Sequence, residues 1–168
     1  MKKLKIVKEI KCQDAPMVFA RVLGISKQNF LLESKDVSHI YGRLSLIGID
    51  PVLEIKGKNE DFEIKALNKR GCDYLDQLRK NDLRICDSLE VGKSIIKGVI
   101  KKSSDKKMEE SSRTKIKNIA AIIRVFLKKF KQDQKEFLGL YGAFSYDFIR
   151  LFEDIPERLG DEGVTDFR

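Results

Sequence analysis

The feature that most limits the possible folds is a pair of alternating segments on either side of a turn-rich stretch. In residues 52–56 and 62–66, apolar side chains alternate with charged ones, and residues 57–61 between them read Gly-Lys-Asn-Glu-Asp. Alternation with a period of two predicts half-buried strands, and a turn between two such strands predicts a β-hairpin. The partly alternating segment 43–49 precedes this hairpin. We therefore predict an antiparallel meander over residues 43–66.

A long amphipathic helix is the second predicted element. Its apolar residues recur at steps of three and four, which is the spacing of one helix face: they are Ile116, Ile119, Ala120, Ile123, Phe126, Leu127 and Phe130. Ser112 and Thr114 are suitable caps, so we predict a helix over residues 114–132 that packs on one face of the sheet. Asp14 and Pro16 favour the start of a shorter helix, and another is predicted over residues 72–80.

These elements predict a mixed α/β (α+β) fold, with largely antiparallel sheets packed against helices. Residues 29–33 form a short apolar run that is typical of a buried strand. The glycines and aromatics of residues 137–146 predict a strand packed closely against another backbone, and residues 147–152 predict a helical turn. Residues 101–113 are polar and low in complexity, so we expect a mobile loop. A chain of 168 residues normally forms one domain, or two small ones.

The net charge of +8 is concentrated in one segment. Residues 92–135 carry 14 basic and 4 acidic side chains, and most of the basic ones are lysines. A nucleic-acid interface would favour several arginines and interleaved aromatics. This segment has only Arg113 and Arg124, and its two phenylalanines fall on the apolar helix face. A solvated helix face is therefore the favoured interpretation, with nucleic-acid binding as the alternative.

Composition also limits location and chemistry. No stretch approaches the roughly 18 apolar residues that a membrane span needs, and charges interrupt the start of the chain, so we expect a cytoplasmic protein. Cys12, Cys72 and Cys86 share no close spacing, which fits a reducing compartment and gives no zinc pattern. The single histidine, His39, leaves little room for Ser-His or Cys-His catalysis.

The run from Asn29 to Ser34 is the main candidate binding segment. Three apolar residues follow Asn29, and the run ends in Glu33 and Ser34. A carboxylate can hold an ammonium group, and a hydroxyl can hydrogen-bond a polar atom. The run could therefore line a pocket for a small zwitterion. A strand end that faces solvent is the alternative.

Two groups of residues resemble a known enzyme family. Leu31-Leu32-Glu33-Ser34, followed by Gly42-Arg43-x-Ser45-x-Ile47-Gly48-x-Asp50-Pro51, is similar to the amino-terminal region of anthranilate synthase component I. The later stretch Gly139-x-x-Gly142-x-Phe144-x-Tyr146-Asp147-x-x-Arg150 is similar to a glycine-rich segment of that family. The resemblance covers residues 14–156. Four residues depart from the usual pattern: Leu44, Leu138, Ala143 and Ser145.

The resemblance implies a lyase that converts chorismate and ammonia, or glutamine, to anthranilate and pyruvate in the first step of tryptophan biosynthesis. It implies Mg²⁺ in the full-length enzyme and a glutamine amidotransferase, component II, as partner. It also implies a four-layer αββα architecture, of which residues 1–168 would be the amino-terminal region with a truncated tail over 157–168. By the same resemblance, Ser34, Glu33 and Leu32 would form part of the tryptophan feedback site.

The family's chorismate-binding half, with its magnesium carboxylates and acid-base residues, has no match in this chain. We therefore expect no catalytic residue here, no cofactor or metal bound by this chain alone, and no activity without the missing half. Para-aminobenzoate synthase component I shares the general layout and remains an alternative. A stand-alone binding module for a small ligand is a further alternative.

Overall fold

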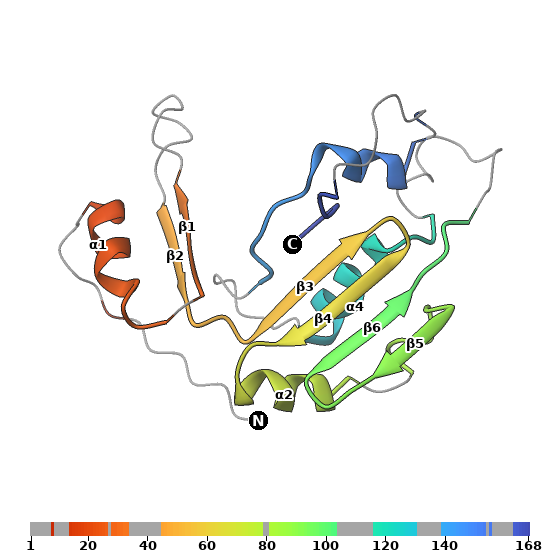
Figure 1. Cartoon of the computed structure of the whole chain (residues 1–168), viewed down its shortest axis with the longest axis horizontal. Helices are drawn as coiled ribbons and strands as arrows, with labels where there is room; N and C mark the ends of the chain where they lie inside the picture. Colours follow the sequence, from red (N-terminus) through yellow and green to blue (C-terminus); the bar gives the residue numbers. More distant parts are fainter. Residues whose placement is uncertain are drawn as a thin grey trace. The chain divides into compact units, whose positions relative to one another are not determined.

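A computed structural model of the chain describes residues 8, 14–26, 28–33, 45–78, 81–103, 116–130, 139–153, 155 and 163–168. The chain divides into two compact units, Met1–Pro51 and Val52–Arg168. Helices and antiparallel sheets make up both units (Figure 1). The mixed α/β class predicted from the sequence is therefore confirmed.

The described residues of the first unit form a helix and a pair of antiparallel strands. Helix α1 spans Ala15–Val22 and has Pro16 in its first turn, as predicted, although the Asp14 side chain makes no capping hydrogen bond. Strands β1 (Asn29–Glu33) and β2 (Ser45–Ile49) pair antiparallel. None of the described residues before Val52 is buried. The predicted strand at residues 29–33 is confirmed, but its predicted burial is wrong, because a two-stranded hairpin under one short helix covers little surface.

The second unit is built on a four-stranded antiparallel sheet (Figure 1). Its strands are β3 (Leu53–Lys58), β4 (Asp61–Ala66), β5 (Ser88–Val91) and β6 (Ile95–Val99), in the order β3-β4-β6-β5. The predicted hairpin is confirmed, with a tighter turn than expected. Asn59 in that turn has φ 56°, a left-handed conformation that asparagine tolerates better than most residues. Strands β5 and β6 are not among the elements predicted above.

The predicted meander over residues 43–66 is wrong. Strand β2 pairs with β1, whereas β3 pairs with β4 in a different sheet. The chain passes from one sheet to the other at Asp50-Pro51. Asp50 has φ 52°, which is not an extended conformation, and proline has no N–H group for a sheet ladder.

Side-chain hydrogen bonds cap the starts of two helices in the second unit. Helix α2 (Lys69–Asp76) begins before the predicted residue 72, because the Asn68 side chain accepts a hydrogen bond from the Gly71 N–H at 3.0 Å. Helix α4 (Ala120–Phe130) begins later than predicted, where Asn118 Oδ1 accepts from the Ala120 N–H at 3.0 Å. The predicted caps Ser112 and Thr114 lie outside the described residues.

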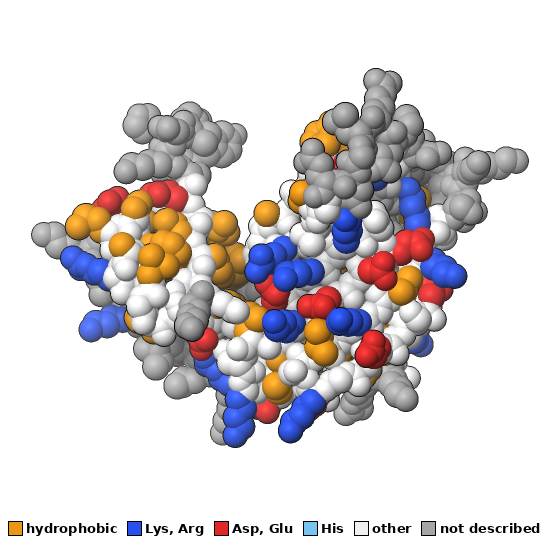
Figure 2. Space-filling view, in the orientation of Figure 1, with side chains coloured by type: hydrophobic (Ala, Val, Ile, Leu, Met, Phe, Trp, Pro, Cys, Tyr) orange, Lys and Arg blue, Asp and Glu red, His pale blue; other side chains and the backbone are white. Residues whose placement is uncertain are grey.

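Helix α4 covers one face of the four-stranded sheet (Figure 1), as predicted. The core between them contains buried side chains from the sheet, from α2 and from α4. The largest fully buried side chains are Ile64, Ile96, Ile100, Ile119, Ile122 and Asn118. The other face of the sheet carries mostly charged side chains, as Figure 2 shows.

The end of the chain adds a strand-like segment to this sheet. Phe167 forms isolated β-bridges with Gly57 of β3 and with Phe144. Of the predicted strand 137–146, residues 139–146 are described, and they contain this single bridge and no longer ladder. The helical turn predicted at residues 147–152 is confirmed as the 3₁₀ helix η1 (Tyr146–Leu151). Most of the predicted mobile loop, residues 104–113, lies outside the described residues.

Candidate functional site

The predicted binding residues lie at the end of β1, as far as they are described. Leu32 pairs with Leu46 and Glu33 with Ser45. Leu32 is 43% exposed, and Glu33 is also exposed. Consecutive strand residues point to opposite sheet faces, so the Leu32 and Glu33 side chains do not converge on one face. Ser34 lies outside the described residues.

Asn29 fixes the other end of β1. Its Nδ2 donates hydrogen bonds to the Val22 carbonyl at 3.2 Å and to the Ser26 carbonyl at 2.7 Å. Its Oδ1 accepts a bond from the Asp50 N–H at 3.4 Å. One side chain therefore joins the end of α1, the loop after it and the end of β2.

Gly48 has a steric reason for its place in the first motif. It pairs across the hairpin with Phe30, and a Cβ atom there would lie 2.0 Å from the Phe30 ring. The ring therefore occupies the space that a larger side chain would need. The motif residue shapes the hairpin and does not itself offer a group to a ligand.

The second motif packs against the end of the chain. The Ala143 N–H donates to the Arg168 carbonyl at 3.0 Å, and the Arg168 N–H donates to the Ala143 carbonyl at 3.1 Å. A Cβ atom at Gly142 would lie 2.1 Å from the Arg168 carbonyl oxygen. The close backbone approach predicted from the glycines is therefore present, and residue 168 is its partner.

Aromatic rings support this packing. Phe148 lies 4.4 Å from Phe144 and 5.4 Å from Phe152 between ring centroids. Phe167 meets Phe148 edge-on at 6.1 Å. Tyr146, by contrast, is 91% exposed. The aromatics of the motif thus mainly hold η1 against the chain end.

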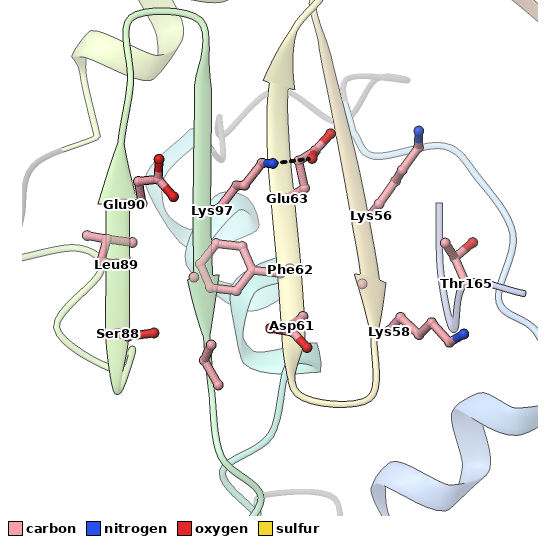
Figure 3. Close-up of a pocket in the computed structure, with 13 residues that line it drawn as sticks. Lys56, Lys58, Asp61, Phe62, Glu63, Ser88, Leu89, Glu90, Lys97 and Thr165 are labelled. Atoms are coloured by element: carbon pink, nitrogen blue, oxygen red, sulfur yellow. Dashed lines mark ion pairs between the residues drawn. The ribbon is translucent and has the colours of Figure 1, made fainter. Parts of the chain in front are cut away.

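A hollow of about 660 Å³ lies on the open face of the four-stranded sheet (Figure 3). Its charged lining residues come from all four strands, and opposite charges alternate across them. In the strand register, Lys56 lies opposite Glu63, and Glu63 lies opposite Lys97. Lys97 in turn lies opposite Glu90. Figure 3 also shows the ion pair between Lys97 and Glu63, whose charged atoms lie 3.7 Å apart. A surface with balanced charges does not select a ligand of one sign.

Glu54 anchors the edge of this face. Its carboxylate lies 3.1 Å from Lys56 Nζ and accepts a hydrogen bond from Arg168 Nε at 2.7 Å. Burial raises the pKa of Glu54, but the hydrogen bonds and charges of Lys56 and Arg168 outweigh it, so this pKa lies below its ordinary value. Sequence reasoning assigned no role to these residues, although the charges at alternate strand positions indicate an exposed face.

Two findings on the described residues concern metal binding and thiol chemistry. These residues contain no group of three or more His, Cys, Asp or Glu side chains that could hold a metal ion. Burial raises the pKa of the Cys86 thiol, and the neighbouring Asp87 adds to that effect, which disfavours the nucleophilic thiolate. No described helix is long and apolar enough to cross a membrane.

This chain is similar to curated proteins named anthranilate synthase component 1 or anthranilate synthase. Anthranilate synthase component 1 of Buchnera aphidicola subsp. Schizaphis graminum (strain Sg) is 26% identical over 156 residues, which are 92% of this chain and 30% of that protein. The component 1 protein of Buchnera aphidicola subsp. Rhopalosiphum maidis is 27% identical with the same coverage. Anthranilate synthase of Azospirillum brasilense is 29% identical over 121 residues, which are 71% of this chain and 16% of that protein.

The chain thus spans 30% or less of the length of these relatives. No protein-family model matches it. The resemblance predicted from the motifs is nevertheless confirmed: over 92% of its length, this chain is similar to component 1 of anthranilate synthase.

Proposed function

We propose that this chain is the amino-terminal part of component I of anthranilate synthase. The complete enzyme would convert chorismate and ammonia, or glutamine, to anthranilate and pyruvate, in the first step of tryptophan biosynthesis. The similarity to component 1 proteins over 92% of the chain carries this proposal. Because the chain spans 30% of those proteins, the proposal assigns the chemical step to the remaining part.

Two protein partners follow from this assignment. The first is the chorismate-binding half, which would hold Mg²⁺ and the acid-base residues. The second is a glutamine amidotransferase, component II, which would supply ammonia. This chain would then have a supporting and regulatory role.

The regulatory role would be feedback inhibition by tryptophan. Glu33 would pair with the ammonium group, Ser34 would hydrogen-bond the polar end, and Leu32 would contact the indole. Both described residues of this set are exposed, so a ligand can reach them. Because Leu32 and Glu33 face opposite sides of β1, the ligand would have to lie around the strand end.

Inhibition would act through linked binding. Tryptophan at the end of β1 would favour an arrangement of the enzyme that binds chorismate weakly. At equilibrium, chorismate must then weaken tryptophan binding by the same factor. The chain alone should bind tryptophan weakly or not detectably, since the rest of the pocket would come from the other half. Micromolar binding in a calorimetric titration of the chain alone would contradict this.

Reconstitution tests the assignment to component I. The chain is purified alone and together with a chorismate-binding half of component I from the same organism, and both samples receive chorismate, ammonia and Mg²⁺. Anthranilate should form only in the mixture. An active chain alone, an inactive mixture with a soluble complex, or 4-amino-4-deoxychorismate as the product would each refute the assignment.

Two substitutions test the feedback site in the active mixture. Ser34→Phe and Glu33→Gln should each raise the tryptophan concentration for half-inhibition about tenfold or more, with little change in turnover. Glu63→Gln, on the four-stranded sheet, is the matched control and should leave inhibition unchanged. Inhibition that is equally strong in all three variants would rule out this site.

A further inference from the structure

The two edges of the four-stranded sheet differ in what lies beside them. At the β3 edge, the Gly57 N–H donates to the Phe167 carbonyl at 3.1 Å, and the Phe167 N–H donates to the Gly57 carbonyl at 3.3 Å. The opposite edge is β5, which pairs with β6 and with no other described strand (Figure 1). An edge strand presents a row of N–H and C=O groups to which an extended segment can bind.

The strand register shows which backbone groups of β5 face outward. The Gly92 N–H donates to the Ile95 carbonyl at 2.8 Å where β5 turns into β6. In an antiparallel pair, every second residue bonds to the partner strand, so Glu90 is the next residue that bonds to β6. Leu89 and Val91 therefore direct their N–H and C=O groups away from β6. No described residue bonds to these outward groups.

A row of alternating charges across the open sheet face ends at Glu90. Lys56, Glu63, Lys97 and Glu90 follow one another from β3 to β5. Lys97 leans toward Glu63, at 3.7 Å, and away from Glu90 (Figure 3). Within the described part of the chain, the exposed Glu90 is in no ion pair. The next position of this row, on a strand added beside β5, would therefore suit a cation.

The other face of β5 is apolar. Leu89 and Val91 are the neighbours of Glu90 in the strand, so their side chains point to the opposite sheet face. Leu89 packs against the core, whereas Val91 is 60% exposed. Residues 88–91 also include neither proline nor lysine, with which natural proteins often block an exposed edge. An apolar side chain beside Val91 would cover it.

We propose that the β5 edge is a docking site for an extended segment of another polypeptide, with one cation between two apolar residues. The segment adds antiparallel to β5, and its backbone bonds to the outward groups of Leu89 and Val91. Its lysine or arginine lies opposite Glu90 in a non-hydrogen-bonded pair, where side chains approach closely. Its apolar residues lie opposite Leu89 and Val91. The proposal does not depend on the enzyme assignment.

Charge argues against two other occupants. If two copies of this chain paired antiparallel through the outward groups of Leu89 and Val91, Glu90 would lie opposite Glu90 of the other copy. Like charges directly opposite each other are destabilising. A polybasic segment is also disfavoured, because the net charge of +8 repels it over a distance. A single cation between uncharged residues fits both conditions.

Nuclear magnetic resonance of the whole chain tests the proposal with the blocked peptide Thr-Val-Lys-Val-Thr. At millimolar concentration, the peptide should slow hydrogen exchange of the Leu89 and Val91 amides about threefold or more and leave that of Ile96 unchanged, because the Ile96 amide faces β4. A peptide with glutamate in place of lysine should bind about threefold more weakly. No binding, or protection only at amides outside β5, would overturn the proposal.

A charge variant tests the contact with Glu90. Glu90→Gln should abolish the preference for the lysine peptide over the glutamate peptide. The matched control is Asp61→Asn, which removes the same charge from β4 and should retain a preference of about threefold. A preference that survives Glu90→Gln, or that Asp61→Asn abolishes equally, would show that Glu90 does not select the cation and would overturn the proposal.

A backbone variant tests strand addition independently of charge. Val91→Pro removes an outward N–H group without removing a bond to β6, which an edge strand tolerates. It should weaken binding of the lysine peptide about tenfold, while the spectrum of α4 stays unchanged. The control Val91→Thr keeps the N–H group and should stay within about threefold of the unaltered chain. Equal binding by Val91→Pro would overturn the proposal. So would self-association in sedimentation that Val91→Pro abolishes, because the occupant would then be a second copy.

Discussion

The two units of this chain use their apolar side chains differently. In Val52–Arg168, Ile64, Ile96 and Ile122 are at most 1% exposed. In the first unit, Met17, Leu23 and Ile25 are more than half exposed, and Figure 2 shows hydrophobic side chains gathered on the surface over α1 and its hairpin. Both units contain a helix and antiparallel strands. They differ in whether a second layer covers the apolar faces.

This difference shows where the stability of the chain resides. A two-stranded hairpin is at best marginally stable, whereas three or more strands packed against a helix can form a core. The second unit meets that condition with four strands and α4. The first unit must rely on local bonds such as those of Asn29. Equivalent substitutions in the two units should therefore have unequal effects.

The largest contrast is expected for truncated apolar side chains. Ile122→Ala should lower the free energy of unfolding by about 3 kcal/mol, since the fully buried side chain leaves a cavity in the core. Leu23→Ala, at a site that is 54% exposed, should change it by less than about 0.5 kcal/mol. Urea unfolding followed by circular dichroism measures both. A loss at Leu23 as large as that at Ile122 would show that the first unit also has an essential core.

A second contrast compares two asparagines that join segments. Asn118 is 1% exposed; it caps α4 through Ala120 and donates to the Leu151 carbonyl at 3.0 Å. Asn118→Ala removes the cap and leaves a buried carbonyl without its partner, so it should cost about 2 kcal/mol. Asn29→Ala, at a half-buried site, should cost about 1 kcal/mol. Amide hydrogen exchange in α4 and in β1 would measure the two effects, and equal losses would remove the contrast.

The sequence predicts correctly those helices and strands that a short stretch of residues specifies by itself. The hairpin of β3 and β4 follows from alternation around a turn, and η1 follows from a short segment of its own. Strands β5 and β6 carry a similar signal, since Gly92 and its neighbours separate two short runs. The predicted start of α4 is too early, because Ile116 and Ile119 continue the helical spacing of apolar residues to the N-terminal side of the cap at Asn118.

Long-range contacts and the candidate site were harder to predict. The bridge between Gly57 and Phe167 joins distant parts of the chain, and no local pattern specifies it. Asp166 likewise accepts a hydrogen bond from the Asn59 N–H at 2.6 Å. The sequence placed Leu32 and Glu33 on a strand correctly. The buried strand predicted there is wrong for Leu32 and Glu33, which are exposed, because burial depends on what covers the strand.

A third contrast lies within the glycine-rich motif of the second unit. A Cβ atom at Gly142 would meet the Arg168 carbonyl oxygen, whereas one at Gly139 would have no neighbour within 4 Å. Gly142→Ala should therefore destabilise the chain by about 1.5 kcal/mol and weaken exchange protection of the Arg168 amide. Gly139→Ala should change stability by less than about 0.5 kcal/mol. Equal effects would show that residues 165–168 can shift without cost.

The smallest expected effect concerns the charge that ties the chain end to β3. Because Lys56 and Arg168 hold the pKa of Glu54 below its ordinary value, the unfolded chain binds more protons at this site than the folded chain in acid. The stabilisation is therefore present above the ordinary pKa and is lost as pH falls through the lowered one.

Glu54→Gln should cost less than about 1 kcal/mol near neutral pH and should flatten the dependence of stability on acidity. Denaturation of this variant and of a Glu63→Gln control between about pH 6 and pH 2 would measure the effect. A slope unchanged by Glu54→Gln would mean that Glu54 does not link the chain end to the sheet, and the second unit would then depend on its apolar core and backbone bridges alone.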